Sequence, residues 1–449
     1  MKIGRRGCLA SLGLGTAAAW TSPLVAAVPA RQSRDLTIKA VRVTPVALPD
    51  PPLLAASGCH GPYFLRNIVE VDTADGVTGI GETHGGEETT NELLACRESI
   101  VGRSAAAVRG FSAARAKGDS VYAGIELACL DAVGRATGLR LCELLGGPTR
   151  EEVEFSSYLF YRYAADDSRL LADRRLVDDR GRGDRALDTF GEVRTPEAMA
   201  ELAAAFHARH GFRIHKLKGG VLPPDVELDT LRAMHARLGD GRTLRIDPNA
   251  RWRVETAVRI GESLKDLPLE YYEDPVRGQA DMAEVRRRCG LPMSTNMCVT
   301  QFDHIAPAIA TRPVDIVLCD HHGWGGLLAC QALGQMCETL GWGMSQHSNN
   351  HAGITMAAMT HLAAATPHLK FASDTHYPWL VEGADLLEGP NLKFKDGKMT
   401  VPTGAGVGVE LDRDKLARAN ETYEKCGMRG RDDRTTMRMV EPSWTGDPF

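Results

Sequence analysis

The spacing of apolar residues changes near position 150. Before that point, residues 36–83 form short alternating runs separated by turns, a period of two that predicts β-strands in hairpins. Residues 88–147 have a helical pattern that ends at Gly146-Gly147-Pro148. We therefore expect a small α+β domain over residues 31–150.

From about residue 152, short β-rich runs alternate with amphipathic stretches at intervals of about 22 to 30 residues, after a longer first step through the charged segment 164–190. The runs are EFSSYLFY, FRIHKLK, TLRIDPN, LEYYEDP, LPMSTN, DIVLCD, GWGMSQH and KFASD. Eight strands alternating with helices predict an α/β fold, a (β/α) barrel over residues 151–395. A doubly wound sheet is the alternative, but no Gly-rich phosphate loop follows the first strand. Residues 396–449 are expected to pack back on the first domain.

The first thirty residues differ from the rest of the chain. Arg5 and Arg6 precede a weakly apolar stretch, a small-residue site follows at 28–30, and no acid occurs before Asp35. This layout is typical of a bacterial signal peptide of the twin-arginine type. We therefore expect residues 1–30 to be removed and the protein to be periplasmic, without membrane contact after cleavage. An uncleaved membrane anchor and a cytoplasmic location are the alternatives.

Composition argues against a nucleic-acid partner. The net charge is −5, and no basic stripe or run stands out among the 25% charged residues. The eleven cysteines include no C-x-x-C spacing, which argues against a zinc ribbon or a redox motif. Cys129, Cys319 and Cys330 lie in apolar surroundings and are expected to be core thiols.

The stretch FRIHKLKGG, residues 212–220, places Lys216 and Lys218 on one face of a predicted strand, because alternate residues share a face. One interpretation is a solvated sheet edge, where lysines block unwanted pairing. In a barrel, however, the strand ends carry the chemistry. Two neighbouring ammonium groups favour proton loss from one of them, which a lysine base requires.

Polar groups also end the strands that follow Lys218. They are Asp247, Glu273, Asn296, Asp320, His347 and Asp374. Asp-Pro dipeptides are common in turns, but so many successive strand ends are hard to explain as turn chemistry. Two carboxylates and an amide on three consecutive strands offer only oxygen, which suits Mg²⁺. Lys218 and His347 would approach that cation from opposite sides, with Asp320 fixing the imidazole tautomer.

The motifs KxK, DPN, EDP, TNM and HSNNH, followed by DTHYPW and GRDDRTTM, occur in the order found in the enolase superfamily. The chain resembles its glucarate dehydratase subgroup, which is mandelate racemase/muconate lactonizing enzyme-like, from about residue 36 to 444. The resemblance implies a modified (β/α)7β barrel with an α+β capping domain formed by the N-terminal region and the C-terminal tail. It also implies a homo-oligomer that dehydrates an acid sugar, D-glucarate or a close relative, to a 2-keto-3-deoxy acid.

The resemblance also implies roles for individual residues. Asp247, Glu273 and Asn296 would bind Mg²⁺, and Lys218 and the Asp320–His347 pair would be the two bases. Lys216 would neutralise the enediolate. Implied substrate contacts are His60, Tyr158, Phe160, Lys216, Asn249, Ser348, Asn349, His376 and Arg431, with Asn249 also counted as catalytic. Simpler interpretations stay open for five of them: core residues for Tyr158 and Phe160, loop or turn residues for His60 and Asn349, and a solvated charge for Arg431.

Two segments depart from the subgroup. FSAARAKGDS, residues 111–120, replaces a longer Gly-rich segment that carries a substrate-contacting threonine, and the loop VRGQADMAEV after Glu273 is also short. The identity of the sugar therefore stays open. The alternatives are an epimerase or dehydratase of another aldaric or aldonic acid, and a non-catalytic periplasmic acid-sugar binding protein. Binding alone would not need Lys218 together with the Asp320–His347 pair.

Overall fold

The computed structural model describes residues 34–177 and 190–449, and residues 35–449 form one compact unit. The expected signal peptide, residues 1–30, lies outside the described residues and stays a prediction. Among the described helices, none is both long enough and apolar enough to cross a membrane.

An antiparallel sheet with the order β1-β4-β5 forms the N-terminal capping domain. Its strands are β1 (Ile38–Pro49), β4 (Tyr63–Thr73) and β5 (Thr78–His84), and a short hairpin of β2 (Leu54–Ala55) and β3 (Gly58–Cys59) precedes β4. Helices follow the sheet: α1 (Glu87–Ile100), η1 (Ala105–Gly110), α2 (Ser112–Arg115), α3 (Asp119–Thr137) and α4 (Leu141–Leu144). Val69 and Val71 of β4 are buried against Ile125 and Cys129 of α3. The alternating sequence thus places one face of the sheet against the helices.

Eight strands form a parallel barrel that matches the eight predicted runs in order. They are β6 (Glu152–Phe160), β7 (Ile214–Lys218), β8 (Thr243–Asp247), β9 (Leu269–Glu273), β10 (Met293–Thr295), β11 (Ile316–Cys319), β12 (Gly343–Gln346) and β13 (Ser373–Thr375). The sheet order is β12-β11-β10-β9-β8-β7-β6-β13, and the first strand pairs with the last. Strands β12 and β13, at the two ends of this order, are joined by a side-chain hydrogen bond: Gln346 Nε2 donates to Ser373 Oγ at 2.9 Å. The strands therefore form a barrel and not a doubly wound sheet.

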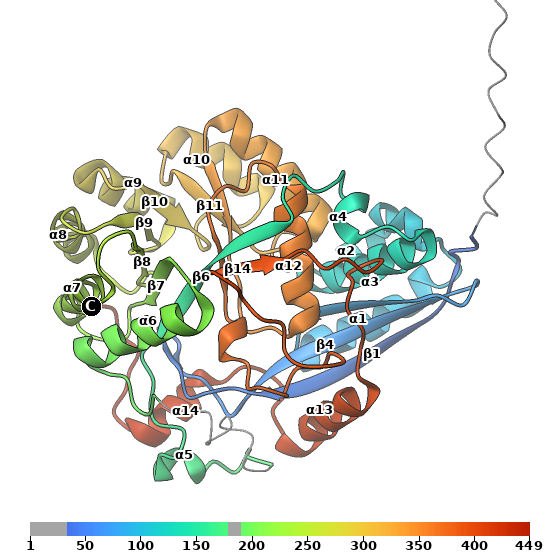
Figure 1. Ribbon diagram of the computed structural model, residues 1–449, viewed down its shortest axis with the longest axis horizontal. Helices are drawn as coiled ribbons and strands as arrows, with labels where there is room; N and C mark the ends of the chain where they lie inside the picture. The colour runs from blue at the N-terminus through green and yellow to red at the C-terminus, as the bar shows by residue number, and fades with distance from the viewer. Residues whose placement is uncertain (1–33, 178–189) are drawn as a thin grey trace, which may run out of the picture. The chain divides into compact units, whose positions relative to one another are not determined.

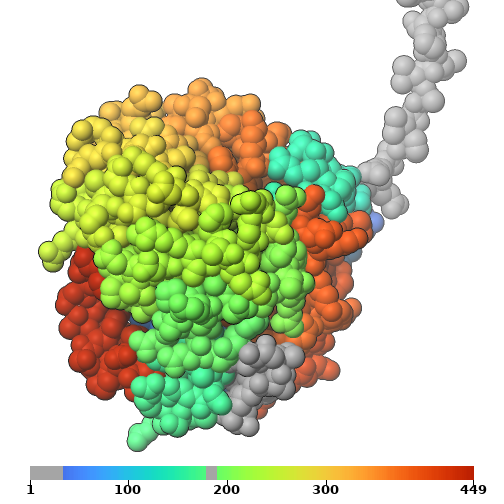
Figure 2. All heavy atoms as spheres, turned by 60° about the vertical axis from the view of Figure 1, so that its left-hand side comes forward, coloured from blue at the N-terminus to red at the C-terminus, as the bar shows by residue number. Residues whose placement is uncertain are grey.

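Helices connect successive barrel strands on the outside. After the short α5 (Ser168–Leu171) they are α6 (Pro196–His210), α7 (Pro224–Leu238), α8 (Val254–Leu264), α9 (Gly278–Cys289), η3 (Phe302–His304), α10 (Ile305–Thr311), α11 (Leu327–Leu340) and α12 (Gly353–Ala365). Only the 3₁₀ turn η4 (Tyr377–Trp379) follows β13 directly, so the expected (β/α)7β barrel with its capping domain is confirmed. In Figure 2 the green-to-yellow part of the chain, which contains helices α6 to α9, forms a continuous surface on the face shown.

Helix α12 lies between the barrel and the capping sheet (Figure 1), and all of its residues are buried. Its sequence, GITMAAMTHLAAA, accordingly has no charged face. Glu82 of β5 accepts the backbone N–H groups of Ala352 and Thr355, both at 2.8 Å, at the start of this helix. The capping sheet therefore satisfies helix-terminal donors that α12 cannot satisfy itself.

The C-terminal segment packs on the capping domain. It holds β14 (Lys398–Thr400), which pairs with the start of β6, then α13 (Arg413–Cys426) and α14 (Asp433–Val440). Asn420 of α13 donates to the backbone oxygen of Pro45 in β1 at 2.8 Å, and α14 contacts β3. Figure 1 shows α13 beside strand β1 of the blue sheet. The loop between them carries Arg431 to the edge of the barrel.

A buried glutamate joins the capping domain to the barrel. Glu126 of α3 is 1% exposed, and its Oε2 accepts the backbone N–H of Leu327 at the start of α11. Its Oε1 is buried and has no hydrogen-bond partner among the described residues. Burial raises the pKa of Glu126 to about 7, against the opposing effect of the Leu327 and Leu328 N–H groups.

This raised pKa predicts that stability falls as the pH rises from about 4.5 to 7. Over that window the unfolded glutamate is ionised while Glu126 in the folded protein keeps its proton, so the unfolded state binds fewer protons. The loss approaches about 3 kcal/mol at roughly 1.36 kcal/mol per pH unit. Urea unfolding of the wild type and Glu126→Gln at pH 5 and 7.5 measures it. Identical pH dependence in the two proteins would contradict the assignment.

Candidate active site

A cavity of about 340 Å³ lies at the C-terminal ends of the barrel strands. Its lining includes Phe160, Lys218, Asn249, Asn296, Asp320, His347 and His376 from the barrel, Ser57, His60 and His84 from the capping domain, and Arg431 from the C-terminal segment. A cavity of about 360 Å³ elsewhere is lined by Phe206 and Trp379, among others, and by none of the predicted site residues. The chemistry therefore belongs to the first cavity.

The two lysines of β7 are buried, Lys216 completely and Lys218 with 6% exposure, so neither is an edge-blocking residue. Lys216 Nζ lies 2.6 Å from Asp374 Oδ2 and also contacts Glu273. Lys218 Nζ lies 2.5 Å from Asp247 Oδ2. Although burial opposes it, the Asp374 and Glu273 carboxylates hold the pKa of Lys216 above its ordinary value. Lys216 is therefore a fixed cation beneath the cavity.

Three oxygen-bearing side chains converge from neighbouring strand ends. Asp247 ends β8, Glu273 ends β9, and Asn296 follows β10, where its Nδ2 donates to Glu273 Oε1 at 2.6 Å. Asp274 orients this loop by accepting the backbone N–H of Asn296 at 2.7 Å. Asn249 donates its backbone N–H to Asp247 Oδ1 at 2.9 Å from a left-handed conformation, φ +52°. Asn249 and Asn296 line the cavity, whereas Asp247 and Glu273 are buried behind its wall in contact with Lys218 and Lys216.

The charges around these oxygens favour a hard divalent cation. The carboxylates of Asp247, Glu273, Asp274 and Asp374 are all fully buried. Only three buried basic side chains balance these four acids: Lys216, Lys218 and Arg245. Burial, together with Asp247 and Asp374, raises the pKa of Glu273 well above its usual range despite Lys216. Burial and Asp247 also raise the pKa of Asp274 to about 7. A cation beside Glu273 and Asp247 would compensate the excess negative charge.

His347 and Asp320 form a pair at the ends of β12 and β11, with 3.3 Å between His347 Nδ1 and Asp320 Oδ2. Burial raises the pKa of Asp320, but hydrogen bonds from His322 and His347 outweigh it and hold this pKa well below the usual range. An ionised Asp320 leaves His347 Nε2 available for proton transfer. In the sheet order, strands β8, β9 and β10, which carry Asp247, Glu273 and Asn296, lie between β7 and the strands β11 and β12 of the Asp320–His347 pair.

The structure brings most of the expected substrate contacts to the cavity wall: His60, Phe160, Asn249, Ser348, Asn349, His376 and Arg431. Arg431 Nη2 lies 3.0 Å from His60 Nε2, so two segments far apart in the chain meet there. Tyr158 and Lys216 do not line the cavity. Tyr158 is fully buried below it, and its hydroxyl accepts from Lys216 Nζ at 3.3 Å.

Sequence reasoning missed several residues of the wall, among them His84 and Trp324, as well as His322 behind it. His84 ends the capping strand β5, and the other two lie in DHHGW directly after Asp320. The two histidines directly after the strand-end Asp320 could have indicated the DHHGW segment, which contains His322 and Trp324. The end of a strand in another domain offers no comparable signal, because only packing brings it to the barrel.

The glycines after Lys218 serve close packing. A Cβ at Gly219 would lie 2.6 Å from Glu227 Oε2, and one at Gly220 would lie 2.1 Å from the backbone oxygen of Pro248. Glu227 accepts the backbone N–H of Gly220 at 2.9 Å and that of Val221 at 2.8 Å. The sequence KGG therefore forms a tight turn that fixes the position of Lys218 against the DPN loop.

We expect Gly220→Ala to destabilise the protein more than Gly290→Ala. Both glycines have positive φ, +71° and +66°, but a Cβ at Gly290 meets open space. The left-handed conformation costs each alanine about 1–2 kcal/mol, and the clash with Pro248 adds roughly 1–3 kcal/mol at position 220. Urea unfolding of both variants gives the difference. Equal losses would mean that the turn relaxes freely.

Comparison with known proteins identifies two matching families. Residues 38–146 match the mandelate racemase / muconate lactonizing enzyme N-terminal domain, and residues 198–415 match the enolase C-terminal domain-like family. A Streptomyces coelicolor protein named "Probable glucarate dehydratase" is 41% identical over 92% of this chain and 98% of its own length.

Solved structures show the same relationship. An enolase from Thermobispora bispora, complexed with magnesium and formate, is 41% identical with a TM-score of 0.85, covering 92% of this chain and 99% of its own. An enolase from Pseudomonas fluorescens with bound magnesium, potassium and tartrate is 36% identical with a TM-score of 0.85, and the match covers 92% of this chain and 99% of that enolase. The chain belongs to the mandelate racemase/muconate lactonizing enzyme group of the enolase superfamily.

Proposed function

We propose that this protein is a Mg²⁺-dependent dehydratase of an acid sugar, D-glucarate or a close relative. One observation carries the proposal: Lys218 and the Asp320–His347 pair line a single cavity on strands that flank three converging oxygen donors. The 41% identity to a probable glucarate dehydratase supports it. Binding alone would not need Lys218 together with the Asp320–His347 pair.

Asp247, Glu273 and Asn296 would hold the cation, in agreement with their oxygen-only chemistry and the excess carboxylate charge. When bound, Mg²⁺ stabilises the negative charge that develops on a substrate carboxylate as the neighbouring C–H bond breaks, as in other sites of this superfamily. Lys216, a fixed cation held by Asp374, supports the same charge from below the cavity.

The chain's own groups account for the proton transfers. Lys218 Nζ or His347 Nε2 removes the proton α to the carboxylate, and the electron pair of that bond forms an enediolate. The enediolate then expels the β-hydroxyl, which leaves as water after receiving a proton from an acid, for which we propose His347. The resulting enol takes up a proton at carbon and becomes the 2-keto-3-deoxy acid. One molecule of water is lost in total.

The part of the cavity wall formed by Arg431 and His60 suits a second carboxylate. Arg431 Nη2 lies 3.0 Å from His60 Nε2 and 2.6 Å from Asp433, and Asp50 accepts from His60 Nδ1 at 3.1 Å. A diacid would place one carboxylate at this guanidinium and the other at the metal site. Tartrate, a hydroxy diacid, is bound by solved relatives from Mycobacterium smegmatis and Pseudomonas fluorescens. Epimerisation of an acid sugar is the second candidate, because two bases on opposite sides permit it.

A product assay tests the proposal. The protein is incubated with Mg²⁺ and a panel of acid sugars, and 2-keto-3-deoxy products are detected with semicarbazide, while NMR in D₂O follows exchange at the α-carbon. We expect product from a diacid sugar, its loss with EDTA and its recovery with Mg²⁺. Exchange with inversion but no keto product would favour the epimerase. Neither product nor exchange from any diacid would refute both.

A further inference from the structure

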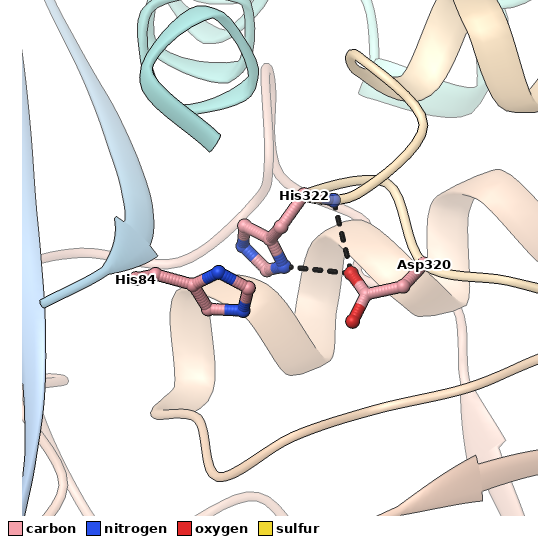
Figure 3. Close-up of side chains that lie close together, drawn as sticks. All are labelled: His84, Asp320 and His322. Carbon is pink, nitrogen blue, oxygen red and sulfur yellow. Dashed lines mark hydrogen bonds and ion pairs between the residues drawn. The ribbon is translucent and has the colours of Figure 1, made fainter. Parts of the chain in front are cut away.

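A second group of metal-ligating side chains lies beside the cavity, apart from the three oxygen donors. His84, Asp320 and His322 each offer a ligand atom, and these atoms all lie within 4.8 Å of one another. Figure 3 shows His322 between the other two, bonded to one oxygen of Asp320, with a ring nitrogen of His84 facing the same side. His84 comes from the capping sheet, whereas Asp320 and His322 follow β11.

One nitrogen of His84 is available as a ligand. Its Nδ1 lies 2.9 Å from Ser120 Oγ, and that hydroxyl donates to the backbone oxygen of His322 at 3.3 Å. Ser120 therefore accepts from Nδ1–H, which leaves the lone pair on Nε2. In the described part of the chain this Nε2 is buried without a hydrogen-bond partner. Burial, with His322 and Arg66 nearby, lowers the pKa of His84 well below its usual value, so the ring stays neutral.

His322 presents its other nitrogen to the same place. Its Nε2 lies 3.2 Å from the backbone oxygen of Glu82 and 3.1 Å from Arg66 Nη2. In the tautomer that donates Nε2–H to Glu82, the lone pair is on Nδ1, which is then the ligand atom. This Nδ1 lies 2.9 Å from Asp320 Oδ1. Two imidazoles and one carboxylate suit a borderline cation such as Zn²⁺ or Co²⁺ better than Mg²⁺. His84 and Asp320 line the cavity, so an ion can reach the group from there.

We propose that His84, Asp320 and His322 form a second metal site, selective for Zn²⁺ over Mg²⁺, and that its occupation takes Asp320 away from His347. Binding uses the Nδ1 lone pair of neutral His322, whose single ring proton then lies on Nε2 and is donated to the backbone oxygen of Glu82, so the ring releases no proton. Zn²⁺ thereby acts as an inhibitor through the base pair rather than through the oxygen donors. The binding is independent of the proposed function, and the inhibition rests on it.

Metal binding tests the site directly. Full-length protein with saturating Mg²⁺, which fills the oxygen site, is dialysed against Zn²⁺, and Co²⁺ is added separately to record the visible absorption of a four-coordinate ion. The variants are His84→Gln and His322→Gln, with His235→Gln on α7 as the control. We expect one Zn²⁺ per wild-type or control chain and at least roughly tenfold weaker binding in the two ligand variants.

Each outcome decides one part of the proposal. Wild type without a Zn²⁺ ion beyond the Mg²⁺ site, or unchanged affinity in His84→Gln, overturns the site; His84→Gln serves even if the buried His322→Gln fails to fold. At fixed excess Mg²⁺, the Zn²⁺ concentration that halves turnover should be at least roughly tenfold higher for His84→Gln than for wild type. Zn²⁺ binding without inhibition would overturn the competition for Asp320. A protein that binds Zn²⁺ but dehydrates no sugar would refute only the proposed function.

Discussion

Replacing Lys218 by methionine is expected to lower kcat/KM by about 10²–10⁴-fold, the usual contribution of a general base. Methionine keeps an unbranched apolar side chain in the space of the lysine stem but cannot take a proton. Lys218 lines the cavity, whereas Lys216 lies beneath it in contact with Asp374, so only Lys218 can reach substrate from β7. The effect should appear in the chemical step rather than in folding.

The measurement separates chemistry from metal binding. Because Lys218 Nζ neutralises Asp247 at 2.5 Å, the variant should be assayed over a range of Mg²⁺ concentrations. In D₂O it should lose α-proton exchange for one substrate configuration and keep exchange for the other, which His347 serves. Lys265→Met, at an exposed position directly after α8, controls for loss of a lysine. Unchanged kcat/KM in Lys218→Met would remove the residue from the mechanism.

Replacing Asp320 by asparagine should lower kcat by a comparable factor, about 10²–10⁴. The carboxylate accepts from His347 Nδ1 and so keeps the proton off Nε2. An amide can present N–H instead, which favours the opposite tautomer, and it carries no charge to stabilise the imidazolium. Because hydrogen bonds hold the pKa of Asp320 well below its usual range, the native residue is ionised throughout any practical assay.

Exchange at the α-carbon again gives the specific readout. Asp320→Asn should lose exchange on the configuration that Lys218→Met retains, and the exposed Asp229→Asn should change neither. If the protein were an epimerase, either substitution alone would stop inversion, since each inversion uses both bases. Loss of exchange on the same configuration in both variants would contradict the placement of the bases on opposite sides.

Much of the site could be predicted because a parallel barrel brings consecutive strand ends to one side. The order of the runs was enough to expect Asp247, Glu273 and Asn296 together, since successive strands of such a barrel are neighbours. The period of two placed Lys216 and Lys218 on one face. Periodicity gives the face of a side chain but not its depth, so it did not reveal that Lys216 and Tyr158 lie beneath the cavity.

The sequence by itself determined the family of folds, the barrel order and the identity of the groups at the strand ends, because these follow from local pattern and from motifs within one strand and its turn. Only the tertiary structure decided which distant segments complete the wall. His84 from the capping sheet reaches the cavity through packing between elements, whereas Arg431 was expected there from the resemblance alone and not from residue spacing. Such contacts depend on how whole elements pack, which the spacing of residues along the chain does not encode.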